Sequence, residues 1–161
     1  LVESGSPRAA PVFRSLIAYL RAAMPQLHQA APATLGDEER LVRAYLELML
    51  MRMPDRLTFT VEIDPALRSL AFPQMGLLTL VENALKHGLQ PLPEGGCIQV
   101  GVSRSGAVLT LTVGDTGRGM GDASGHGTGL ANIRARLRAL HGAAAALSLQ
   151  VNEPRGVRAT I

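Results

Sequence analysis

A chain of 161 residues has room for one domain and a short appended element. Hydrophobic residues make up 47% of it, enough for a core, but aromatic residues make up only 3%. A base-stacking surface is therefore disfavoured and no nucleic acid partner is expected, whereas the formal charge of +3 suits an anionic small ligand. Cys97 is the only cysteine, which excludes a disulfide framework and a cysteine zinc cluster.

Two helices are predicted in the first third of the chain. Over residues 12–27, apolar residues recur at the i, i+3, i+4 and i+7 spacing of an amphipathic helix. These residues are Phe13, Leu16, Ile17 and Leu20. A second helix begins after Thr34, which is placed as an N-cap with Asp37 three residues on. Its apolar face consists of Leu41, Val42, Tyr45, Leu48 and Met49.

The remaining elements alternate between strands and helices. Residues 57–63 alternate like a half-buried strand, Pro73 opens a helix that Gly88 closes, and residues 97–115 form a hairpin with its turn at Ser105 and Gly106. A glycine-rich loop over 114–129, a helix over 130–142 and strands over 145–151 and 156–161 follow. The helix points Leu130, Ile133, Leu137 and Leu140 inward and stops at Gly142. This order predicts an α/β two-layer sandwich with an N-terminal helical segment.

The helix that ends at Gly88 carries the stretch VENALKHG, with four polar side chains close together. Asn83, Lys86 and His87 lie at i, i+3 and i+4, so an α-helix would gather them into one patch bordered by Glu82. An amide oxygen suits a Mg²⁺ ion that also holds phosphate oxygens, and a lysine is a point charge for phosphate. The alternative is an ordinary solvated helix face.

The stretch DTGRGM begins where an alternating strand ends. Asp115 at that strand end can accept a hydrogen bond from an exocyclic amine, and Gly117 and Gly119 allow a ligand to approach the backbone. The alternative is a common turn, because aspartate and glycine are frequent turn residues.

The stretch GHGTGL leads directly into a helix, with glycines at positions 125, 127 and 129. Backbone N–H groups at a helix start favour an anion. A Rossmann dinucleotide site needs a strand directly before its glycines and a βαβ unit around them. Neither is present here, so the sequence does not predict a Rossmann site. The alternative is a flexible surface loop.

Together, in this order, the three stretches resemble the GHKL ATPase superfamily, which includes gyrase, the 90-kilodalton heat-shock chaperone, histidine kinases and mismatch-repair ATPases. VENALKHG is similar to the N box of that superfamily, DTGRGM to its first glycine box and GHGTGL to its second. The resemblance implies the Bergerat-type ATP-binding fold, with ATP and Mg²⁺ as ligands.

One branch is more similar than the others. TLGDEERLVRAYLELMLMR, FPQMGLLTLVENALKHGL and GTGLANIRARLRALHG look like sensor histidine kinases of the LytS type, which pair with LytTR-type response regulators. The likeness covers roughly residues 33–161, and residues 12–27 would match the second helix of that family's dimerisation hairpin. It implies a remnant of a dimerisation helix and linker over 1–33 and a catalytic domain over 34–161.

The family implies metal and phosphate roles for the helix. Asn83 would coordinate Mg²⁺, and Lys86 and His87 would face the phosphates of ATP. Glu82 takes the acidic position before the asparagine, and the expected catalytic residues are Glu82, Asn83 and Lys86.

The family implies adenine and lid roles for the two glycine-rich stretches. Asp115 would bind the adenine amino group in a pocket shaped by Gly117 and Gly119. The lid and the cradle for the triphosphate would be formed by Gly127, Thr128, Gly129 and Leu130.

Three departures from the family pattern bear on activity. Hydrolysing members carry a water-activating glutamate where this chain has Thr79, which disfavours efficient ATP hydrolysis. A Gly-Thr pair that helps to bind adenine is here Gly156-Val157. The phosphoacceptor histidine of the family follows a proline, but Pro11 is followed by Val12, so the acceptor is expected upstream of this chain.

The expected function is that of the ATP-binding catalytic domain of a two-component sensor histidine kinase. It would transfer the γ-phosphoryl to an upstream histidine, and from there to a response regulator, in a homodimer joined through upstream helices. A degenerate nucleotide-binding or dimerisation module without kinase activity is the alternative. No apolar stretch reaches the length of a membrane span. The resemblance implies a cytoplasmic domain, and we expect it to be a fragment of a longer, membrane-anchored protein.

Overall fold

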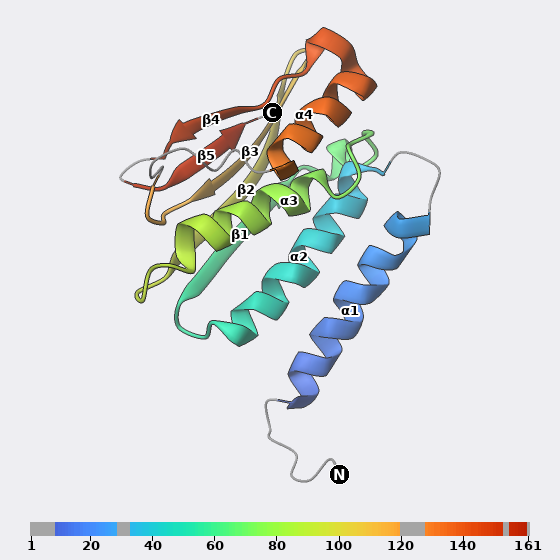
Figure 1. Cartoon of the computed structure of the whole chain (residues 1–161). Coiled ribbons are helices and arrows are strands. Elements are labelled where there is room, and N and C mark those ends of the chain that lie inside the picture. The colour runs from blue at the N-terminus through green and yellow to red at the C-terminus, as the bar shows by residue number, and fades with distance from the viewer. Residues whose placement is uncertain (1–8, 29–32, 120–127, 153–154, 161) are drawn as a thin grey trace.

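The computed structural model describes residues 9–28, 33–119, 128–152 and 155–160. It confirms the two-layer α/β architecture, because a five-stranded sheet forms one layer and the helices lie on one of its faces (Figure 1). None of the described helices is both long enough and apolar enough to cross a membrane.

The sheet joins its strands in the order β1-β2-β3-β5-β4. The strands are β1 (Leu57–Ile63), β2 (Gly96–Ser105), β3 (Val108–Asp115), β4 (Ser148–Val151) and β5 (Val157–Thr160). Strands β1 and β2 are parallel, with Leu57 opposite Gly96, because a helical crossover joins them; the other pairs are antiparallel.

The β2–β3 turn differs by one residue from the prediction. Ser105 pairs with Val108, so the turn residues are Gly106 and Ala107 rather than Ser105 and Gly106. Gly106 has a φ of +59°, a conformation that glycine adopts without steric cost.

The helical layer contains the predicted helices with revised bounds. They are α1 (Ala9–His28), α2 (Leu35–Arg52), α3 (Gly76–Asn83) with a π-helical extension η2 (Ala84–Leu89), and α4 (Thr128–His141). Two short 3₁₀ turns, η1 (Pro65–Leu67) and η3 (Gly142–Ala144), complete the described elements. The predicted cap of α2 is confirmed as a capping box: Thr34 Oγ1 accepts from the N–H of Asp37 (3.2 Å), whose carboxylate accepts from the N–H of Thr34 (2.9 Å).

The core between the two layers is aliphatic. Of the α4 residues that we predicted to point inward, Leu130, Ile133 and Leu137 are buried, but Leu140 is 41% exposed, so that prediction was wrong. Leu140 lies in the last turn before Gly142, whose φ of +61° ends the helix. The fully buried side chains from other elements include Leu35, Leu41, Leu46, Leu57, Leu77, Leu85, Leu89, Ile98 and Leu111.

The helix that we predicted from Pro73 to Gly88 is not a single α-helix. It begins at Gly76, after Met75 in the left-handed conformation (φ 57°), and it widens into a π-helix after Asn83. The N–H of Gln90 donates to the carbonyl of Leu85 five residues back (2.9 Å), which is the π-helical pattern. The i, i+3, i+4 spacing of Asn83, Lys86 and His87 therefore does not place them as an α-helix would.

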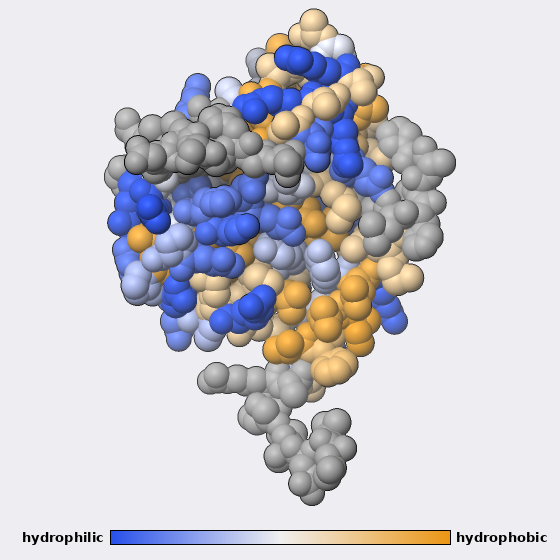
Figure 2. All heavy atoms as spheres, viewed as in Figure 1, coloured by the Kyte–Doolittle hydropathy of each residue, from blue (hydrophilic) through white to orange (hydrophobic). Residues whose placement is uncertain are grey.

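Helix α1 lies on the side of α2 that is away from the sheet (Figure 1). It packs on α2 through small residues, Ser15 and Ala23, and through a contact between the rings of Tyr19 and Tyr45, whose centroids are 6.0 Å apart. Its predicted apolar stripe instead faces outward, over the surface where apolar residues gather in Figure 2. The predicted residues are Phe13, Leu16, Ile17 and Leu20, which are 66%, 37%, 44% and 47% exposed, and Met24, one turn further on, is 55% exposed.

Candidate functional site

A tight turn at the end of β3 forms the centre of the candidate site. Asp115, the last residue of β3, is only 2% exposed, and its Oδ1 accepts from the N–H of Gly117 (2.8 Å). The side-chain amide of Asn152 donates to the carbonyl of Asp115 (2.7 Å). Thr116 exchanges two hydrogen bonds with Cys97 on β2: the Thr116 N–H donates to the Cys97 carbonyl (3.1 Å), and the Thr116 hydroxyl accepts from the Cys97 N–H (2.9 Å). The turn is thus fixed by neighbours on both sides.

Two glycines let this turn pack directly on the end of the π-helix. A Cβ atom on Gly88 would lie 2.6 Å from Asp115 Oδ1, and one on Gly117 would overlap the backbone of Gly88. The N–H of Arg118 donates to the carbonyl of Gly88 (3.0 Å). On the other side, Gly156 (φ +111°) would overlap the carbonyl of Asp115 if it carried a side chain. Backbone therefore meets backbone around the Asp115 carboxylate.

The polar residues of α3 and η2 keep their polar atoms accessible. Asn83 is half-buried, whereas Lys86 and His87 are exposed. Within the described ranges, Asn83 makes no side-chain hydrogen bond and Lys86 no ion pair. Gly88 packs against the Asp115 turn. Because His87 directly precedes Gly88, this end of the π-helix lies next to that turn.

The start of α4 lies beside α3. A Cβ atom on Gly129 would lie 3.0 Å from the Thr79 methyl group, and Leu130 is buried in the core. The Thr79 hydroxyl donates to the carbonyl of Met75 (2.8 Å), so it is used within its own helix. Thr128 is the first residue of α4, whereas Gly127 lies outside the described residues, as do 120–126.

Glu82 is exposed on α3, and its charge acts on tyrosines of α1 and α2. Burial, followed by the negative charge of Glu82, raises the pKa of Tyr45 to about 12. The same two causes raise the pKa of Tyr19. Partial burial also raises the pKa of the Glu82 carboxyl.

Two residues near the site were missed by the sequence reasoning. Asn152 gave no local signal, because the turn that it supports is 37 positions away in the chain. Glu38 did give one: by helical periodicity it falls on the same face as Leu41 and Val42, where a carboxylate is unusual. Burial raises the pKa of Glu38 to about 7, although the N–H groups of Met75, Leu77 and Leu78 act in the opposite direction.

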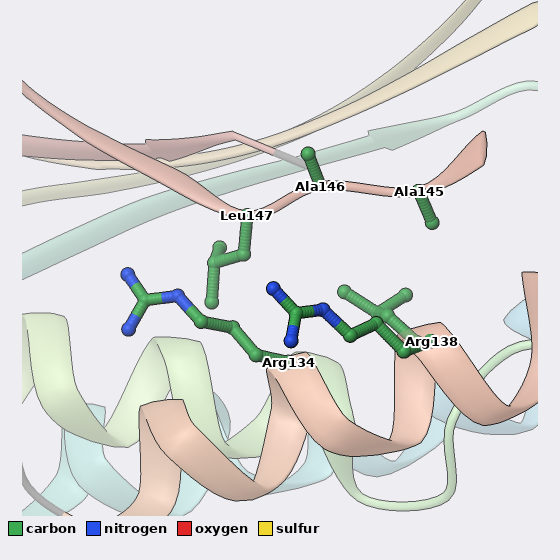
Figure 3. A pocket seen from close by; sticks show the side chains of 6 residues that line it. Arg134, Arg138, Ala145, Ala146 and Leu147 are labelled. Atoms are coloured by element: carbon green, nitrogen blue, oxygen red, sulfur yellow. The ribbon is translucent and has the colours of Figure 1, made fainter. Parts of the chain in front are cut away.

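A separate hollow lies between α4 and the segment that leads into β4. Figure 3 shows Arg134 and Arg138 reaching from α4 toward that segment. Its lining is Arg134, Leu137, Arg138, Ala145, Ala146 and Leu147, none of which is a candidate site residue.

Comparison with known proteins gives a consistent set of relatives. Residues 72–161 match the family described as "Histidine kinase-, DNA gyrase B-, and HSP90-like ATPase". Sensor protein LytS of Staphylococcus haemolyticus is 35% identical over 133 residues, which cover 74% of this chain and 23% of that protein. Sensor histidine kinase YesM of Bacillus subtilis is 30% identical, with 80% and 23% covered. The chain thus spans about a quarter of the length of these curated relatives.

Solved structures share the fold at low sequence identity. The catalytic domain of histidine kinase ThkA has a TM-score of 0.60 at 20% identity, over 81% of this chain and 92% of that one. The histidine kinase domain of the Erythrobacter litoralis EL346 blue-light activated histidine kinase has a TM-score of 0.57 at 20% identity, over 96% and 78%.

Gly117→Ala is expected to lower the free energy of unfolding by about 1–3 kcal/mol, because the added methyl group forces the turn away from Gly88. Gly114→Ala is the control, since its Cβ would lie 3.5 Å from the Asn152 amide, an ordinary contact. That variant should be as stable as the parent or slightly more so. Thermal and urea unfolding measure both, and equal tolerance of the two alanines would contradict the packing described for the turn.

Proposed function

The chain belongs to the family of histidine kinase-, DNA gyrase B- and HSP90-like ATPases, and from this we propose that it is the ATP-binding catalytic domain of a sensor histidine kinase. It binds Mg·ATP and transfers the γ-phosphoryl to a histidine upstream of this chain. A response regulator, of the LytTR type, then receives the phosphoryl group.

The buried Asp115 carboxylate, held where two backbone segments meet, is the observation that carries this proposal. A carboxylate at the end of a strand can accept a hydrogen bond from the adenine amino group. Gly117 shapes the pocket by packing on Gly88, and the open backbone at Gly119 leaves room for a flat base. Because Asn152 and Gly117 already fix the turn, the carboxylate does not have to reorganise when the base binds.

The residues of α3 and η2 suit the phosphates and the metal ion. Asn83, whose amide makes no hydrogen bond to the described part of the chain, would hold Mg²⁺ through its oxygen. Lys86 and His87 are exposed and would face the phosphate oxygens. The beginning of α4 lies next to Thr79 and favours negative charge. The triphosphate cradle and lid that we propose there are formed by Gly127, Thr128, Gly129 and Leu130.

Phosphoryl transfer in such a site depends mainly on positioning and electrostatics. The charge of exposed Glu82 acts on Tyr19 of α1, and we propose that an acceptor helix approaches from this side. Thr79 is a neutral hydroxyl that already donates to a carbonyl, so it cannot serve as the base that activates a water molecule. The site therefore favours transfer to a histidine over hydrolysis.

Helix α1 supplies a surface for the dimer that we propose. Its exposed stripe from Phe13 to Met24 has the helical spacing of a face that packs on another helix. Residues 1–33 would then be the end of a dimerisation segment and 34–161 the catalytic domain. We propose that this domain lies in the cytoplasm.

Asp115→Asn is expected to weaken Mg·ATP binding by about 1.5–3 kcal/mol, because an amide replaces a carboxylate that accepts from adenine. Calorimetric titration of this chain measures the loss. The control is Glu62→Gln, the same carboxylate-to-amide change at an exposed position of β1. Unchanged ATP affinity in the Asp115 variant would remove this residue from the site.

Radiolabelled ATP is expected to label the full-length protein but not this chain alone, because the acceptor histidine lies upstream. In the full-length protein, Asn83→Ala should reduce labelling by about tenfold or more. Loss of a metal ligand, or of a residue that orients one, typically lowers metal affinity or activity by about that factor. Phosphate release by this chain should remain slow.

Stable label on this chain would place the acceptor within it, with His28 at the end of α1 the first residue to test. Rapid phosphate release that survives Glu82→Ala would instead indicate a hydrolytic site.

A further inference from the structure

The first turn of α3 lacks a cap of its own. Met75 stands at the N-cap position in the left-handed conformation, and its side chain makes no capping hydrogen bond. The first N–H groups of a helix have no partners within that helix, so they need acceptors from elsewhere.

Glu38 of α2 supplies these acceptors. Its Oε1 accepts from the N–H of Met75 (2.7 Å), and its Oε2 accepts from the N–H of Leu77 (2.9 Å). The residue is completely buried. A buried carboxylate is costly unless it is hydrogen-bonded, and the positive end of a helix is a favourable place for it. A residue 37 positions away in the chain therefore caps α3.

A second charged side chain holds the same segment from α4. Arg136 Nη1 donates to the carbonyl of Gln74 (2.7 Å), the residue just before Met75. The segment 74–77 is thus held by a carboxylate from α2 and a guanidinium from α4. The other end of this helical stretch is held independently, through the Gly88 carbonyl and the Asp115 turn.

The phosphate side of the proposed site depends on how α3 and α4 are aligned. Gly129 at the start of α4 meets Thr79 one turn after the segment held by Glu38 and Arg136. A shift of that segment would change how the start of α4 faces Asn83. The adenine side, around Asp115 and Gly117, has its own contacts with Asn152 and Gly88.

We propose that Glu38 is a positioning residue of the nucleotide site, which together with Arg136 fixes the start of α3 relative to α4 and so sets the geometry of the phosphate-binding half. Glu38 does not contact the residues that we propose to touch ATP. The inference rests on the proposed function, because it assigns the phosphates to this half of the site.

Glu38→Gln tests this inference, because the amide offers one acceptor and a donor where two N–H groups need acceptors. Mg·ATP affinity should fall by about 10- to 100-fold, the usual effect of losing a group that orients metal ligands. Adenosine affinity should change by less than about twofold, since the Asp115 turn is held separately. The measurement is a pair of titrations on this chain, and the ratio of the two affinities is the readout.

Three further variants separate positioning from a general loss of stability. Glu39→Gln removes another buried glutamate of α2, which pairs with Arg43 and Arg68 and not with α3. It should lower the melting temperature without changing the ratio. Arg136→Gln, at an exposed position, should shift the ratio in the same direction by about two- to fivefold. Arg138→Gln on the same helix should leave it unchanged.

The outcomes distinguish this inference from the proposed function. If the parent chain binds Mg·ATP and both Glu38→Gln and Arg136→Gln keep the parental ratio, the positioning role is overturned while the function stands. If Glu38→Gln fails to fold, the ratio of Mg·ATP to adenosine affinity in Arg136→Gln decides, and a parental ratio there overturns the positioning role. If the parent chain binds neither ligand, the proposed function is overturned and the positioning role with it.

Discussion

The contact of the Asp115 turn with Gly88 is the constraint on which the rest of the structure depends. It joins the end of a central strand to the end of the helical stretch that carries Asn83, Lys86 and His87, with no side chain between the two backbones. The Gly88 carbonyl, near the end of the π-helical stretch that follows Asn83, accepts the N–H of Arg118. Without glycine at 88 and 117, strand and helix could not meet here, and the carboxylate would not be enclosed.

The helices form a continuous series of contacts leading to this junction. Tyr19 of α1 packs on Tyr45 of α2, Glu38 of α2 caps α3, and Arg136 of α4 holds the residue before that cap. Each link joins a different pair of elements through one or two polar or aromatic side chains. These contacts connect α1 to the proposed phosphate site through α2 and α3.

The sequence reasoning succeeded where the signal is local. The capping box of Thr34 and Asp37, the alternating strand 57–63 and the aspartate at a strand end are each encoded within a few residues. It failed where partners are distant: the bonds of Glu38 span 37 and 39 positions, and the bond of Asn152 spans 37. Periodicity also predicted an α-helix through Gly88, because it cannot register one extra residue in a turn. The roles predicted for the site residues remain proposals.

Titration of this chain with ATP, in Mg²⁺ and then with the metal chelated, tests the central claim most directly. We predict one molecule of ATP bound per chain, with an affinity that falls on chelation because Asn83 acts through the metal ion, and an affinity for adenosine that does not change. The absence of binding, or ATP binding that is indifferent to Mg²⁺, would contradict the claim that this fold presents a Mg·ATP site.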